Sequence, residues 1–127
     1  MITRPAPLLT RVAARWMLAP VFVIAGSEAF TEPGARVAKA EDLGVPGPAL
    51  ATRANGAAMV AGGISLALGY KSRLAALGLI ASLIPTTLAG HPFWNETDPA
   101  KIAAQRVQFL KNLGLMGGLL LVATERR

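Results

Sequence analysis

The sequence predicts an all-α integral membrane protein, a four-helix bundle that forms a single domain over residues 1–127. Hydrophobic residues make up 53% of the chain and charged residues only 16%, whereas soluble domains carry about 25% charged residues. The apolar residues gather in four blocks, each close to the roughly 17–25 residues that a bilayer-spanning helix needs. No block alternates with the two-residue period of a barrel strand. We expect spans at about residues 12–30, 51–69, 74–90 and 107–123.

The first span, residues 12–30, has Pro20 near its middle. Proline kinks a helix, and a membrane bundle tolerates the kink where neighbouring groups satisfy the freed carbonyl. Arginines precede the apolar run, and Ser27-Glu28-Ala29 has the small-x-small pattern of a cleavage site. A secretory signal peptide is therefore the alternative. We favour a retained first span.

The segment between the first two spans predicts a short interfacial helix at residues 35–43, ended by the turn residues Gly44-Val45-Pro46-Gly47-Pro48. Residues 70–73 join the second and third spans so tightly that these two spans form an antiparallel hairpin. In the second span Ala54, Ala58 and Gly62 recur every fourth residue. Such small-residue stripes let helix backbones approach closely in lipid.

The fourth span follows the aromatic loop HPFWNETDP. Asp98 is the expected N-cap, with Pro99 at the first helical position. An amphipathic piece at residues 100–106 then leads into the membrane near residue 107. Gly114 and Gly118 form a GxxxG pattern, for which we favour packing within the bundle, with a dimerisation face of a homo-oligomer as the alternative.

The basic residues predict the orientation of the chain. If four spans alternate, one side of the membrane receives Arg4, Arg11, Arg15, Lys71, Arg73, Arg126 and Arg127. Because basic residues concentrate on the cytoplasmic side, we expect both termini to be cytoplasmic. The formal net charge of +6 then serves topology and contact with anionic lipid headgroups, and we expect no nucleic-acid partner.

The residue inventory excludes several kinds of redox chemistry. The chain has no cysteine, which removes thiolate nucleophiles, disulfide exchange and iron–sulfur ligation. Its single histidine, His91, cannot form a haem-ligating pair or a multi-histidine metal site within one chain. No catalytic motif is present, so we expect no intrinsic cofactor and no metal site. Whether the chain is an enzyme stays open; at most it is a quinone-linked oxidoreductase subunit.

Polar groups from all four spans are predicted to meet at one level, in the outer leaflet. Lys111 lies four residues inside the fourth span, about 6 Å deep at 1.5 Å per residue, and shares a helical face with Gln108 and Asn112. The candidate site, a polar cluster for a quinone or lipid, comprises Lys111, Asn112, Gln108, His91, Trp94, Phe93, Glu28 and Asn55.

Lys111 is expected to form an ion pair with Glu28, because charges within a membrane usually pair. The amides of Asn55 and Gln108 would complete the hydrogen bonds. In the alternative, the Lys111 stem lifts its ammonium to the interface, and Trp94 is an ordinary interfacial aromatic.

The sequence HPFWN at residues 91–95, together with QRVQFLKNLGLMGGLLLVA at 105–123, resembles the DoxX family of small bacterial four-helix membrane proteins. AGSEAF, LGVPGP and GYKSRLAAL extend the resemblance along the chain. Glu28 departs from it, since many relatives carry Lys one residue later. The resemblance implies a multi-pass protein of the bacterial plasma (inner) membrane. It also implies links to quinol oxidation, to thiosulfate:quinone oxidoreduction and to the assembly of redox enzymes at the membrane.

Three functions are compatible with these observations. We favour an accessory or scaffold subunit of a membrane-associated redox or cell-envelope complex, with a membrane or membrane-associated protein as partner besides lipids. The alternative is a quinone- or lipid-binding oxidoreductase subunit, in which Lys111, His91 or Asn112 donates to a quinone carbonyl, and Phe93 and Trp94 pack against the ring. In that reading His91 also relays a proton. A small transporter or channel is least favoured, because polar groups confined to one leaflet give no continuous polar route.

Overall fold

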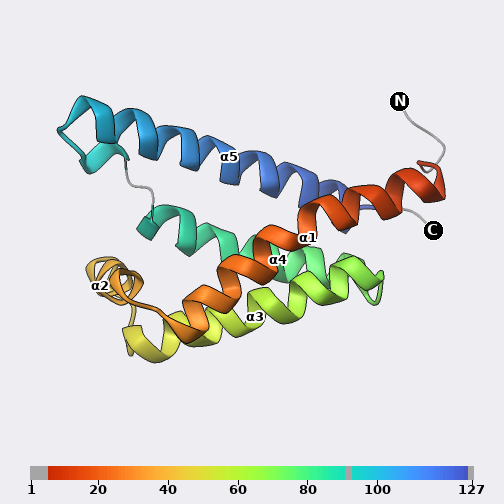
Figure 1. The fold of residues 1–127 in the computed structure, drawn as a ribbon, viewed down its shortest axis with the longest axis horizontal. Helices are drawn as coiled ribbons and strands as arrows, with labels where there is room; N and C mark the ends of the chain where they lie inside the picture. Colours follow the sequence, from red (N-terminus) through yellow and green to blue (C-terminus); the bar gives the residue numbers. More distant parts are fainter. Residues whose placement is uncertain (1–5, 91–92, 126–127) are drawn as a thin grey trace.

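The computed structural model describes residues 6–90 and 93–125 of the chain, so His91 and Pro92 lie outside the described residues. It confirms the all-α class. Four long helices, one short helix and a 3₁₀ turn follow one another (Figure 1). They are α1 (Leu8–Thr31), α2 (Ala35–Asp42), α3 (Pro48–Leu68), α4 (Ser72–Gly90), η1 (Phe93–Asn95) and α5 (Pro99–Ala123).

The four expected spans correspond to α1, α3, α4 and α5, the second of them running one residue past the end of α3, and the expected short helix is α2. The amphipathic piece and the fourth span form one continuous helix, α5, whose N-cap Asp98 accepts a hydrogen bond from the backbone of Ala100 at 3.2 Å, as predicted. Among the described residues, two segments are long and apolar enough to cross a membrane, Leu8–Thr31 and Ser72–Asn95. Helices α3 and α5 are also long, but polar residues such as Asn55 and Lys111 lower their mean hydropathy.

Helices α1 and α3 touch through their backbones at Gly26 and Gly56. A Cβ atom on Gly56 would lie 2.6 Å from the Gly26 carbonyl oxygen, far inside van der Waals contact. Two turns further along α3, a Cβ on Gly63 would meet the Val23 side chain at 2.8 Å. The close face of α3 thus carries Gly56 and Gly63, whereas Ala54 and Ala58 of the predicted stripe are exposed. For these two alanines the expected packing role was wrong.

A single apolar core joins the four long helices. Each contributes a large side chain with almost no exposed surface: Phe22 from α1, Leu66 from α3, Leu79 from α4 and Leu119 from α5. Helix α2 contributes no buried residue. It lies instead across one end of the bundle, against α3 and α4.

The opposite end of the bundle is tied together by polar contacts. Helix α3 ends at Gly69 in the left-handed conformation, φ 73°, and the backbone N–H of Tyr70 closes the turn on the Ser65 carbonyl. This turn makes α3 and α4 an antiparallel hairpin, as predicted. An Arg11–Glu125 ion pair of 3.0 Å joins the start of α1 to the end of the described chain.

Helices α1 and α5 converge at that tied end and diverge towards α2 (Figure 1). Near the convergence a Cβ on Gly118 of α5 would lie 3.3 Å from Leu18 of α1. Towards the α2 end, α1 follows α3 while α5 follows α4. The space between the two pairs of helices therefore widens into a cleft at the α2 end.

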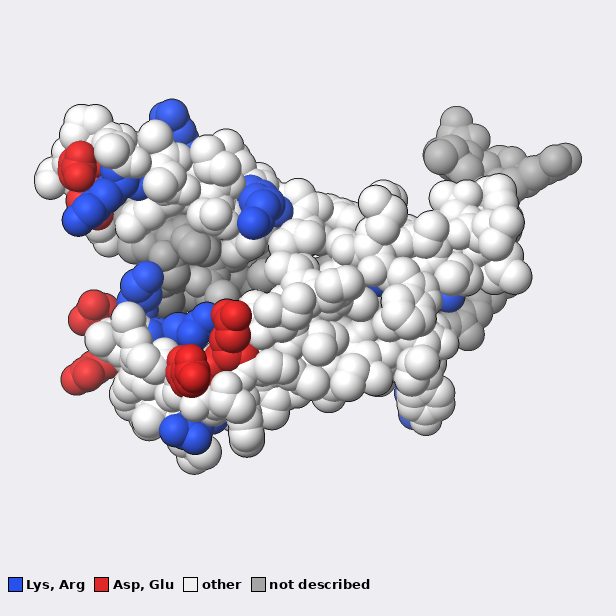
Figure 2. All heavy atoms as spheres, in the orientation of Figure 1, with Lys and Arg blue, Asp and Glu red and all other residues white. Residues whose placement is uncertain are grey.

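Much of the outer surface is apolar. Large side chains such as Leu9 (83% exposed), Met17 (81%) and Leu121 (75%) project outward, as expected where lipid rather than water surrounds a protein. In the view of Figure 2 the charged side chains gather at the α2 end, and most of the remaining surface carries no charge. This distribution suits a helical bundle embedded in a bilayer.

The backbone contact between α1 and α3 predicts that Gly56→Val destabilises the protein, because the new side chain would collide with the backbone of α1. We expect a loss of about 1–3 kcal/mol in the free energy of unfolding, measured by circular dichroism during thermal unfolding in mild detergent. Gly78→Val is the matched control, since a Cβ there meets nothing within 4 Å. Equal loss in the two variants would contradict the contact.

Candidate functional site: a cleft at the α2 end of the bundle

The cleft between the diverging helices has a volume of about 730 Å³ and is lined by residues from all five α-helices. Figure 2 shows it as a hollow at the α2 end, bordered on both sides by lysine and arginine atoms. Its deeper walls are apolar and include Phe22, Met59, Leu83 and Leu115. Its rim is polar and charged.

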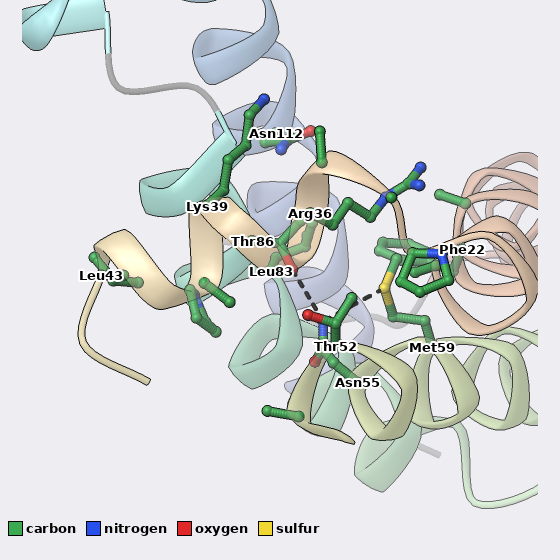
Figure 3. Close-up of a pocket in the computed structure, with 18 of the residues that line it drawn as sticks. Phe22, Arg36, Lys39, Leu43, Thr52, Asn55, Met59, Leu83, Thr86 and Asn112 are labelled. Atoms are coloured by element: carbon green, nitrogen blue, oxygen red, sulfur yellow. Dashed lines mark hydrogen bonds between the residues drawn. The ribbon is translucent and has the colours of Figure 1, made fainter. Parts of the chain in front are cut away.

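Asn55 of α3 lines the cleft together with Thr86 of α4 (Figure 3). Its amide nitrogen donates to Thr86 Oγ1 at 3.0 Å, and its amide oxygen accepts from Ser82 Oγ at 2.7 Å. The Thr86 hydroxyl in turn donates to the Ser82 carbonyl at 2.8 Å. The predicted site residue Asn55 therefore does line the cleft, but α4 satisfies it.

Asn112 of α5 is buried, with 9% of its surface exposed, and its amide nitrogen donates to Thr87 Oγ1 of α4 at 3.1 Å. A buried amide needs such a partner, because an unsatisfied polar group in an apolar setting is costly. The bond fixes α5 against α4. It also places the neighbouring Lys111 at the level of Thr87, inside the candidate span Ser72–Asn95.

Lys111 and Gln108 line the cleft beside Asn112, as their shared helical face predicted. Both side chains are exposed. No hydrogen bond or ion pair joins either of them to another residue of 6–90 and 93–125. The two side chains are therefore available to a molecule in the cleft.

The expected ion pair between Lys111 and Glu28 is not formed. Glu28 contacts Arg36 instead, at 3.4 Å, and does not line the cleft. Arg36 follows Glu28 by eight residues, so α2 brings a cation to this carboxylate with little loop to close. Lys111 is on α5, which diverges from α1 at this level.

The aromatic residues form a separate cluster. The ring centroids of Phe93, Trp94 and Phe109 lie 5.3–5.7 Å apart in edge-to-face pairs, a favourable aromatic geometry. The cluster packs η1 against α5, and none of its members lines the cleft. Phe93 and Trp94 therefore cannot stack on a ring bound in the cleft, as was predicted for them. The third predicted residue of this loop, His91, lies outside the described residues.

Sequence reasoning missed the hydroxyl groups of α4 and the charges of α2. In an otherwise apolar block, Ser82 lies one turn before the adjacent pair Thr86 and Thr87. This spacing of hydroxyl groups is the signal that marks them. Arg36 and Lys39 belong to the short helix that was expected only to lie at the interface. Figure 3 shows Lys39 extending from α2 towards the side where Asn112 lies.

The cleft combines apolar walls with amides and cations at one end. Its charged lining residues among those described are Glu32, Arg36, Lys39 and Lys111. Among the residues that the structure describes, no group of three or more His, Cys, Asp or Glu could hold a metal ion. The arrangement is suited to binding an amphipathic molecule.

The Asn112–Thr87 hydrogen bond predicts that a second substitution partly reverses the effect of a first. Thr87→Val should cost about 1 kcal/mol of unfolding free energy, because it leaves the buried amide without its acceptor. Adding Asn112→Leu should recover part of that loss. The measurement is unfolding in a denaturing-detergent titration, with Thr97→Val, at an exposed position, as control. Strictly additive effects of the two changes would show that the bond contributes nothing.

Comparison with known protein families identifies the family of this chain. The family model described as DoxX matches residues 10–92, which is more than half of the chain and reaches from α1 through α4. The match ends before α5, so Gln108, Lys111 and Asn112 lie beyond it. Neither the curated proteins nor the solved structures give a match. The extent of the family match and the apolar helical bundle agree: the chain belongs to the DoxX family and is a membrane protein of that family.

Proposed function

We propose that this protein binds an amphipathic molecule of the membrane, a quinone or a lipid, in the cleft at the α2 end. The observation that carries the proposal is the composition of the cleft: apolar walls along the helices and polar side chains at one rim. Its volume of about 730 Å³ lies within the roughly 300–1,000 Å³ of small-molecule sites.

The polar rim has hydrogen-bonding capacity that the bundle does not use. Gln108 and Lys111 are three residues apart on α5 and therefore project from one face. Since neither bonds to another described residue, both can donate to a quinone carbonyl or to the oxygens of a lipid head. Asn55 and Asn112, by contrast, are held by α4 and shape the floor.

The tail of such a molecule has an exit along the divergence of α1 and α5. Val21 of α1, 38% exposed, and the half-buried Leu115 of α5 both line this part of the cleft. An acyl or isoprenoid chain lying there stays in contact with apolar surface as it leaves the protein. This geometry favours a ligand that enters from the bilayer.

Closing the cleft should abolish ligand-dependent stabilisation. Gln108→Trp places a large ring in the cleft without disturbing the core, because Gln108 is exposed. Ligand at 100 times its dissociation constant should stabilise the unmodified protein by about 2.7 kcal/mol, seen as a higher thermal midpoint in delipidated detergent solution, and the variant should lose most of this gain. Leu110→Trp is the control, since Leu110 is exposed but does not line the cleft. If no quinone or lipid shifts the midpoint of the unmodified protein, the proposal fails.

A second candidate function, an accessory subunit of a membrane redox or envelope complex, has support from the outer face of α5. Leu110, Gly114, Gly117 and Leu121 follow the helical spacing of one face, and all four are exposed. A Cβ atom on either glycine meets nothing within 4 Å. The two leucines thus flank a shallow notch into which a partner's transmembrane helix can pack closely.

This face predicts that Gly114→Ile and Gly117→Ile, made together, reduce the recovery of partner proteins from native membranes. Purification in mild detergent followed by mass spectrometry measures the recovery, and we expect at least a fivefold loss of the affected partner. Gly78→Ile is the matched control, because Gly78 is also open but lies on α4. Unchanged recovery of every partner would remove this candidate.

A further inference from the structure

We propose that the occupant of the cleft is an anionic phospholipid, with its phosphate at the rim between α2 and α5 and its acyl chains between α1 and α5. This inference rests on the proposed function, that the cleft holds an amphipathic membrane molecule. It adds the charge of the ligand and the residue that selects it, Lys111.

The charge of the rim favours an anion. Among the described lining residues Arg36, Lys39 and Lys111 are cationic and Glu32 alone is anionic. The cations come from two elements on opposite sides of the hollow, α2 and α5, as Figure 2 shows for the blue atoms around it. A phosphate placed between the two elements would be attracted from both sides.

Lys111 supplies the strongest argument because its charge has no counterion within the described protein. The Asn112–Thr87 bond of 3.1 Å holds Lys111 at the depth of an α4 residue inside a candidate span. A cation at membrane depth is costly unless it is paired or reaches water. No carboxylate of the described residues lies within ion-pair distance of Lys111, and the one expected there, Glu28, contacts Arg36 instead. A counter-charge from a bound molecule would therefore stabilise the ammonium at this depth. A lipid phosphate supplies it, whereas the neutral carbonyl of a quinone does not.

Arg36 can contribute to the same site. Its ion pair with Glu28 is long, at 3.4 Å, and both side chains are largely exposed, so the pair is weak. The guanidinium has five donors, of which one reaches Glu28 and another the Glu32 carbonyl at 3.3 Å. Donors therefore remain for phosphate oxygens, which match the planar guanidinium well.

The same charges discriminate against zwitterionic lipids. The ammonium of phosphatidylcholine would enter a rim whose described residues carry three cations and a single carboxylate, Glu32. Specificity is a difference between two affinities, and here repulsion of the choline group adds to attraction of the phosphate. Phosphatidylglycerol, whose head carries only the negative charge, meets no such repulsion.

Native mass spectrometry of the delipidated protein tests the proposal with four probes: phosphatidylglycerol, phosphatidylcholine of the same acyl chains, a menaquinone and inorganic phosphate. We expect phosphatidylglycerol to bind in preference to phosphatidylcholine. Lys111→Met should lower that preference about fivefold, the usual contribution of one lysine beside an anionic lipid. Lys111→Arg, which keeps the charge, should retain it.

Matched variants separate the cleft from general surface charge. Lys101→Met removes the same charge from an exposed position of α5 outside the cleft and should leave the preference unchanged. Glu32→Gln removes a carboxylate from the rim and should raise the preference. Circular dichroism of each variant confirms that the helical fold is retained, and Lys111→Gln, which removes the charge but keeps a polar head, decides the outcome if Lys111→Met does not fold.

The outcomes distinguish this inference from the function on which it rests. Equal binding of the two phospholipids, or binding of the menaquinone alone, overturns the anionic ligand but leaves the cleft as a binding site. Displacement of phosphatidylglycerol by inorganic phosphate overturns the lipid in favour of a free anion. If Lys101→Met lowers the preference for phosphatidylglycerol as much as Lys111→Met does, the effect is one of general surface charge and the proposed site is overturned. Binding of none of the probes overturns both proposals.

Discussion

The direct backbone contact of α1 with α3 at Gly26 and Gly56 determines the shape of the whole molecule. In lipid, helices associate by close packing rather than by exclusion from water, so the smallest residues decide which helices touch. Because α1 is drawn onto α3 there, its C-terminal half cannot also cover α5. Helix α5 is held against α4 by the Asn112–Thr87 bond. The cleft is the space left between the α1–α3 pair and the α4–α5 pair.

Helix α2 and the four long helices contribute different parts of the cleft. It buries no residue in the core, and its face towards the cleft carries Arg36 and Lys39. The four long helices fix the depth and the apolar walls of the cleft, whereas a short amphipathic helix on its rim supplies charge. If the cleft binds a lipid as proposed, changes in α2 can alter which head group is accepted without a cost to the packing of the bundle.

The sequence was sufficient for the elements and for part of the site. Apolar blocks and turn residues predicted the long helices and α2. Helical spacing put Gln108, Lys111 and Asn112 on one face of their helix, and all three line the cleft. The partners of the polar groups were not predictable, because a linear pattern does not tell which helices are neighbours. Asn55 found its partners among hydroxyl groups of α4, and serine and threonine stand out little from an apolar span. Glu28 lies beside Arg36 of the next helix, whereas α5, which carries Lys111, diverges from α1 at this level.

The ion pair between Arg11 and Glu125 has a practical consequence. It brings the start of α1 and the end of α5 together at the face farthest from the cleft, so a fluorescent fusion at either end leaves the cleft unobstructed. The chain contains no cysteine, and a single one introduced on α2 would be its sole thiol. Energy transfer between a dye on that thiol and the fused fluorophore would then report the motion of α2 with no competing label.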